Sequence, residues 1–118
     1  MSTTTSGFQF VPEDILPKLA TIKPYTLLIL TKGENYGIND TPRIIQSEHM
    51  PYIFQQREDG IMVLTMPVMD DTNVTAVAVY NTTDKAHVQK LVDKDPAIQA
   101  GIFNYEIVTA LGLPGDKI

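Results

Sequence analysis

Cysteine is absent from this chain of 118 residues, tryptophan is absent too, and histidine occurs only twice. Without cysteine, disulfides, thiolate catalysis and cysteine-ligated metals are excluded. His49 and His87 lie far apart in the sequence, and neither an HxH nor an HExxH spacing occurs. We therefore expect no dedicated metal site.

Clusters of basic residues and long apolar runs are also missing. The chain has 9 Lys and Arg residues against 14 Asp and Glu residues, and its formal net charge is -5. Binding to a phosphate backbone needs a positive cluster, so no nucleic-acid partner is expected. The apolar runs are too short to span a bilayer, so no membrane partner is expected. Residues 1–7 do not resemble a secretory signal, which predicts a cytoplasmic protein.

The composition that remains is that of a globular protein, with 43% hydrophobic and 19% charged residues. Its hydrophobic periodicity predicts a folded domain over residues 25–111. Residues 1–24 read as a partly flexible N-terminal extension, polar over residues 1–10 and helical over residues 11–22. Residues 112–118 read as a C-terminal tail.

Within this domain, the hydrophobic pattern predicts four strands. They cover residues 25–31, 61–67, 74–80 and 103–109. Helical patterns lie between them, one at 42–58 that Pro51 interrupts and one at about 83–93. The order β-α-β-β-α-β predicts an α+β, ferredoxin-like sandwich with both helices on one face of the sheet.

The first strand is apolar on both of its faces, so the second face of the sheet would be exposed in a single copy. Burial of apolar surface contributes about 25 cal/mol per Å². We therefore expect two sheets to pack face to face, giving a homodimer or a higher homo-oligomer.

Histidine and arginine take part in a helical series in the first long helix. Ile45, His49, Ile53 and Arg57 recur every four residues. Residues at this spacing share one face of a helix, so His49 is expected on or beside the buried face.

The segment after the second helix has the features of a very short helix. Asp95 is suited to cap it, Pro96 to open it and Gly101 to close it. The stretch Asp95-Pro-Ala-Ile-Gln-Ala-Gly-Ile-Phe103 resembles the YciI-like family, whose members carry Asp-Pro-x-x-x-Ala-Gly-x-Phe before the last strand. Two further stretches are similar to that family, His49-Met-Pro-Tyr52 and Gly60-Ile-Met-Val-Leu64.

This resemblance, over roughly residues 25–110, implies the dimeric α+β barrel fold and a pocket with a catalytic pair, His49 and Asp95. It further implies a cofactor-free lyase or isomerase acting on a small cyclic or aromatic-derived organic molecule. Many family members have Gly-Pro at the end of the second strand, and this chain has Met66-Pro67. A methionine there would narrow or reshape the pocket.

Four further residues are expected to bind the substrate: Tyr52, Met66, Asp70 and Tyr105. Tyrosine hydroxyls can donate to a ligand, although core packing is the commoner use of such residues. Asp70 and Asp71 form a carboxylate pair near the expected pocket mouth, an arrangement that is also typical of a solvated turn. Arg43 and Arg57 could hold an anionic group, but surface positions are more typical. His87 is expected on the surface.

Each proposed role has a purely structural alternative. His49 could be a hydrogen-bonded histidine at the edge of the core, and Asp95 could be a helix cap and nothing more. At the level of the whole protein, the alternative is a non-catalytic small-ligand-binding or accessory protein that uses the same pocket. A third hypothesis is a dimerisation module that docks through its N-terminal arm.

Overall fold

The predicted strands form one four-stranded sheet in a computed structural model, which describes residues 7–38, 40–113 and 115. The strands are β1 (Lys23–Lys32), β2 (Met62–Pro67), β3 (Val74–Tyr80) and β4 (Phe103–Gly112). Their spatial order is β2-β3-β1-β4, and β3 runs antiparallel to both β1 and β2. This order places the first and third strands at the centre of the sheet, so the predicted α+β, ferredoxin-like fold is confirmed.

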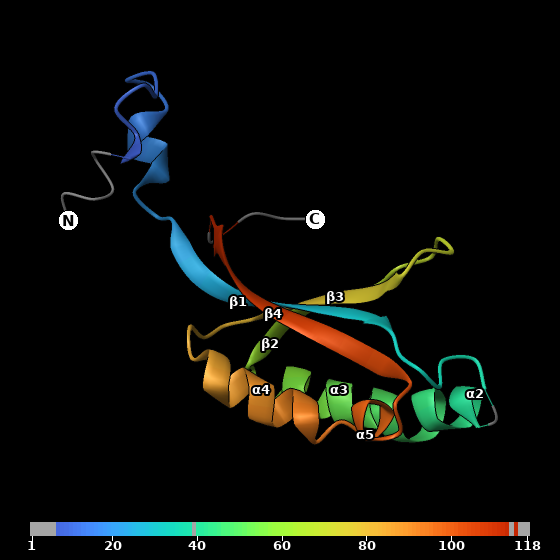
Figure 1. Cartoon of the computed structure of the whole chain (residues 1–118). Helices are drawn as coiled ribbons and strands as arrows, with labels where there is room; N and C mark the ends of the chain where they lie inside the picture. The colour runs from blue at the N-terminus through green and yellow to red at the C-terminus, as the bar shows by residue number, and fades with distance from the viewer. Residues whose placement is uncertain (1–6, 39, 114, 116–118) are drawn as a thin grey trace. The chain divides into compact units, whose positions relative to one another are not determined.

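The helices lie on one face of this sheet (Figure 1). Between β3 and β4 run α4 (Lys85–Asp93) and the single-turn α5 (Pro96–Gln99). Each begins at a capping aspartate: Asp84 accepts from the His87 amide at 3.1 Å, and Asp95 accepts from the Ala97 amide at 2.9 Å. The predicted capped turn after the second helix is therefore confirmed.

The prediction that Pro51 interrupts the helix between β1 and β2 is wrong, because the helical segments follow one another without a break. The helix runs through α2 (Thr41–Ile44), a single π turn, η2 (Ile45–His49), and α3 (Met50–Glu58). Proline has no N–H to donate to the carbonyl four residues earlier, and its ring crowds that carbonyl. The wider π turn just before Pro51 relieves this conflict while the helix continues.

The chain divides into two compact units, Pro24–Ala110 and Met1–Lys23 together with Leu111–Ile118. In the second unit, the helix predicted over residues 11–22 is reduced to one 3-10 turn, η1 (Leu16–Leu19). Pro17 lacks the N–H that an α-helix would need there. The flexibility predicted for residues 1–10 falls partly on residues 1–6, and much of the predicted tail on 114 and 116–118, which lie outside the described residues.

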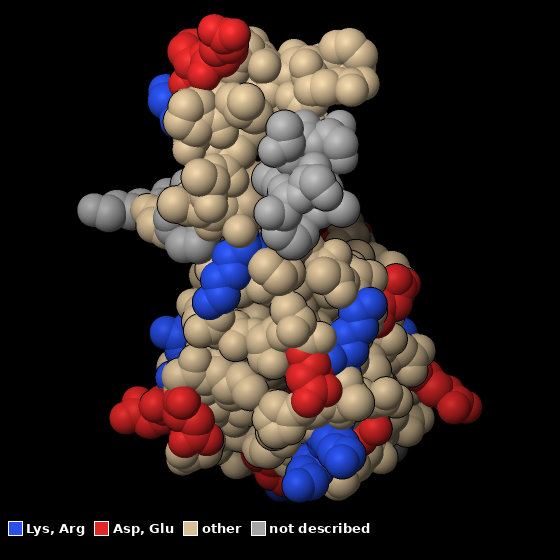
Figure 2. Space-filling model, turned by 90° about the vertical axis from the view of Figure 1, so that its left-hand side faces the viewer, with Lys and Arg blue, Asp and Glu red and all other residues tan. Residues whose placement is uncertain are grey.

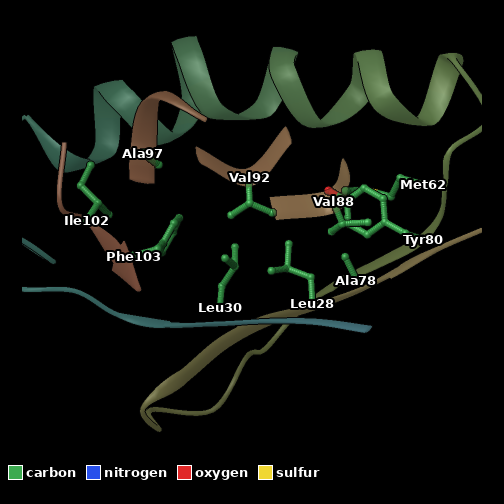
Figure 3. Close-up of a cluster of buried hydrophobic side chains, with 10 residues drawn as sticks. All are labelled: Leu28, Leu30, Met62, Ala78, Tyr80, Val88, Val92, Ala97, Ile102 and Phe103. Atoms are coloured by element: carbon green, nitrogen blue, oxygen red, sulfur yellow. The ribbon is translucent and has the colours of Figure 1, made fainter. Parts of the chain in front are cut away.

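The hydrophobic core of the Pro24–Ala110 unit fills the space between the helices and the sheet. In Figure 3, Leu28, Leu30 and Ala78 point from the sheet toward the helices, and Val88 and Val92 point from α4 toward the sheet. Val88 is fully buried and Val92 is 3% exposed. This packing holds α4 and the sheet in fixed positions, and the remaining helix borders a cavity described below.

Apart from Asp95, which is 3% exposed, no Lys, Arg, Asp or Glu among the described residues is buried. On the face shown in Figure 2, acidic and basic residues are interspersed, and neither sign gathers into one continuous patch there. None of the helices in the described residues is long and apolar enough to cross a membrane.

Candidate active site

The structure brings His49 and Asp95 into direct contact. His49 Nδ1 lies 2.6 Å from Asp95 Oδ2, and the two side chains are only 12% and 4% exposed. An ionised carboxylate can only accept a hydrogen bond, so opposite an ionised Asp95 the donor is Nδ1, and a neutral imidazole in this tautomer has its lone pair on Nε2. These residues are far apart in the sequence, and they meet because α5 packs against η2.

Asp95 uses both carboxylate oxygens. Oδ1 accepts from the Ala97 amide and caps α5, and Oδ2 holds the imidazole. The cap fixes the carboxylate, and the carboxylate in turn fixes the orientation of the ring. The two roles that sequence reasoning set against each other are therefore compatible in one side chain.

The His49 ring is held on a second side by Phe103. The ring centroids are 5.4 Å apart in an edge-to-face arrangement. Within the described part of the chain, Nε2 has no hydrogen-bond partner, and His49 lines a cavity. The free nitrogen is thus available to a bound molecule.

This cavity has a volume of about 520 Å³ and lies between the α2–α3 helix and the sheet. Its walls are mostly hydrophobic. The apolar lining residues are Leu28, Leu30, Ile45, Met50, Ile53, Phe54, Met62, Pro67, Ala76, Ala78 and Phe103. Pockets of this size and polarity bind small organic molecules, with a few polar groups to orient them.

The polar groups on the wall are few: His49, Arg57, Tyr36, Thr65 and Thr75. Sequence reasoning missed Tyr36 and the two threonines as cavity residues, because nothing in their local pattern separates a lining residue from an ordinary loop or strand residue. Arg57 was expected on the surface. It is exposed, but it lines the edge of the cavity. Its spacing of four residues in the series with His49 could have indicated that the two share one face of the helix.

The predicted substrate-binding tyrosines do not line this cavity. Tyr52 donates from its hydroxyl to the Leu91 carbonyl at 2.6 Å, which ties α3 to α4. Burial, with the nearby Asp95 charge, raises the pKa of Tyr52. Tyr105 donates to Asp93 Oδ1 at 2.7 Å. Both hydroxyls are engaged within the protein, so these residues hold elements together.

Met66 is also absent from the cavity wall, and the reason is a β-bulge. The pairing register of β2 with β3 shifts between Met62 and Leu64, so the alternation of side chains is displaced by one residue. Thr65 and Pro67 then face the cavity, and Met66 pairs with Val77 on the other face. The expected narrowing of the pocket by Met66 is therefore wrong.

Asp70 lies beside a second, smaller cavity of about 250 Å³ at the turn between β2 and β3. In the same turn, Asp71 forms an ion pair with Lys32, Nζ to Oδ1, at 2.8 Å. This hydrogen bond lowers the pKa of Asp71 and raises that of Lys32. Tyr36 and Thr75 border both cavities, so the two are adjacent. His87 is exposed, as predicted.

No group of three or more His, Cys, Asp or Glu side chains in the described residues is arranged to hold a metal ion. The chemistry that the site offers is that of an oriented imidazole beside an apolar cavity. Such an imidazole can take a proton from a bound molecule and return it.

No family model matches this chain, and neither does any curated protein sequence. Among solved structures, it is similar to 5-chloro-2-hydroxyhydroquinone dehydrochlorinase (TftG) from Burkholderia phenoliruptrix AC1100, in complex with 2,5-dihydroxybenzoquinone. The TM-score is 0.51 at 18% sequence identity, over 72% of this chain and 90% of that chain. At this identity the likeness concerns the fold alone, and it agrees with the α+β, ferredoxin-like sandwich that the order of the elements predicted.

Proposed function

We propose that this protein is a cofactor-free enzyme of the YciI-like type, a lyase or isomerase that moves a proton on a small cyclic or aromatic-derived molecule. The observation that carries the proposal is the buried 2.6 Å contact of His49 with Asp95 at the wall of an apolar cavity. The solved structure with a similar fold is named a dehydrochlorinase and holds a dihydroxybenzoquinone, a compound of this class.

In the proposed reaction, His49 Nε2 is the base. It takes a proton from an acidic C–H group of the bound molecule, and the electron pair left behind forms a new double bond; after an elimination the imidazolium passes this proton to water. In an elimination, that pair expels a leaving group such as chloride from the neighbouring carbon. In an isomerisation, the imidazolium returns the proton to another carbon. A positioned acid or base of this kind contributes about 10²–10⁴-fold in rate.

Asp95 is proposed as a positioning residue in this scheme. Its carboxylate holds the imidazole in one tautomer and stabilises the imidazolium that forms. Because its second oxygen is fixed by the Ala97 amide, the carboxylate cannot easily rotate away from the ring. The cavity volume of about 520 Å³ fits a molecule with a single ring.

The test uses 5-chloro-2-hydroxyhydroquinone and other chlorinated hydroxyquinols, with chloride release and product spectra as readouts. His49→Gln is expected to lower kcat by about 100-fold or more. Asp95→Asn keeps a good capping residue but removes the charge, so kcat falls and its pH profile shifts while the fold is retained. His87→Gln is the matched control, because His87 is exposed and distant in sequence, and it retains wild-type activity.

Two outcomes would contradict the proposal. One is turnover that survives in His49→Gln at the wild-type rate. The other is tight binding of these compounds without turnover by the wild-type protein, which would favour a non-catalytic ligand-binding or accessory protein.

A further inference from the structure

The two arginines on the α2–α3 helix have opposite surroundings. Arg43 is neutralised by two carboxylates, with Nε 2.8 Å from Asp40 Oδ2 and Nη1 2.9 Å from Glu48 Oε2. Arg57 forms no ion pair and no side-chain hydrogen bond with any described residue. Its guanidinium lies near the ring of Phe54, with 5.7 Å from the guanidinium carbon to the ring centroid.

Arg57 also differs from Arg43 in position, because it lines the 520 Å³ cavity and Arg43 does not. Residues 49 and 57 are separated by about 12 Å along the helix axis, at about 1.5 Å rise per residue. Helical side chains lean toward the helix N-terminus, and the contact with Phe54, three residues earlier, shows this lean. The guanidinium therefore reaches back along the wall toward the His49 end.

No negatively charged side chain on the cavity wall would repel a bound anion. None of its lining residues is Asp or Glu, and Arg57 is its one arginine or lysine. The chain as a whole is acidic, with a net charge of -5, so an unpaired cation at the cavity runs against its overall charge. A guanidinium with an aromatic ring nearby still presents its planar N–H donors, which match a carboxylate with two parallel hydrogen bonds.

We infer that Arg57 binds an anionic group of the substrate, a carboxylate on a compact ring, and so selects small cyclic acids over neutral analogues. This inference rests on the proposed function for the other end of the molecule. The ring lies along the apolar wall, the acidic proton faces His49, and the carboxylate meets Arg57. Arg57 is a specificity-determining residue in this arrangement and does not take part in the proton transfer.

The experiment compares two probes that differ in one charge, 2,5-dihydroxyphenylacetate and the neutral 2,5-dihydroxyphenylacetamide, by titration calorimetry. The wild-type protein binds the carboxylate probe about tenfold or more tightly than the amide, the range expected for hydrogen bonds between charged partners. Arg57→Gln abolishes this preference, because it lowers the affinity for the carboxylate probe and leaves the affinity for the amide unchanged. Arg43→Gln, the matched control, keeps the preference, and thermal midpoints confirm that both variants are folded.

Equal affinities of the wild-type protein for the two probes, no binding of either, or a preference that survives in Arg57→Gln would each overturn the inference. Exchange of carbon-bound hydrogens of the probes with D₂O, followed by NMR, tests the proposed function separately through His49→Gln. Exchange that needs His49 while Arg57→Gln keeps the preference defeats the inference alone. Exchange that is absent or independent of His49, with the preference lost in Arg57→Gln, defeats the proposed function and leaves the anion site standing.

Discussion

Buried polar side chains each have a hydrogen-bond partner among the described residues. Tyr80 is the largest of the fully buried side chains there. Its hydroxyl donates to Gln56 Oε1 at 2.6 Å, and the glutamine is itself only 4% exposed. In the described residues, no buried side-chain nitrogen or oxygen lacks a partner. This pair therefore joins α3 to the end of β3 at no loss of hydrogen bonding.

Tyr80→Phe is expected to destabilise the fold by about 1–3 kcal/mol near neutral pH, because Gln56 is left with an unpaired buried oxygen. Burial raises the pKa of Tyr80, aided by the nearby Tyr52 and Asp95. The pKa of Tyr80 in the folded protein therefore lies above the value of about 10 in the unfolded chain. Its contribution to stability is complete below about pH 10 and is lost as the pH rises from there through the folded pKa.

Urea unfolding near neutral pH and again above about pH 10 checks this expectation. The wild-type protein loses more stability over this interval than Tyr80→Phe does. Tyr36→Phe serves as a control, because Tyr36 is 39% exposed. Equal losses in wild type and Tyr80→Phe would contradict the assigned cause.

At the scale of elements, backbone geometry delivers the site residues. The π turn η2 sets the direction in which the His49 side chain projects from the helix, and the cap of α5 fixes the position of the Asp95 carboxylate. The bulge in β2 determines which side chains of that strand face the cavity. The loop after β1 is fixed against the α5–β4 junction, where the Gly33 amide donates to the Ile102 carbonyl at 2.8 Å and Asn35 donates to that of Gly101 at 2.9 Å.

Gly33→Ala tests this junction. An added Cβ would overlap the carbonyl oxygen of Gly101, a backbone atom that cannot move without shifting α5 or β4. We expect destabilisation by about 1–3 kcal/mol in chemical denaturation, the range for overpacking. Gly7→Ala is the control, since an added Cβ there meets nothing within 4 Å. A Gly33→Ala variant as stable as wild type would show that the contact is not rigid.

At the scale of the whole molecule, the sheet has one helix-covered face and one face without helices from the Pro24–Ala110 unit (Figure 1). On the second face, half-buried Ile29 and Leu27 of β1 stand opposite Val77 and Val79 of β3. Such an apolar strip gains from burial against a second sheet. The homodimer predicted from the sequence stays a prediction.

Light scattering at micromolar concentration is expected to give the mass of a dimer or a higher oligomer. Val77→Asp places a charge in the apolar strip and shifts the protein toward the monomer, with its circular dichroism retained. Thr83→Asp adds the same charge at an exposed position and leaves the assembly unchanged. A monodisperse wild-type monomer would refute the prediction.

The sequence by itself determined the elements and their order. Short runs rich in apolar residues defined β1, β2 and β3, and Asp95, Pro96 and Gly101 defined the capped turn, because these signals act through neighbouring residues. The ferredoxin-like fold followed, since few chain paths satisfy β-α-β-β-α-β.

Only the tertiary structure decided the site. The contact of His49 with Asp95 depends on the packing of α5 against η2, which joins distant parts of the chain. The bulge that turns Met66 away, and the pairing that occupies Arg43 but leaves Arg57 at the cavity, depend on register and on long-range neighbours. Local patterns specify which elements form, whereas side-chain partners are specified by how those elements pack.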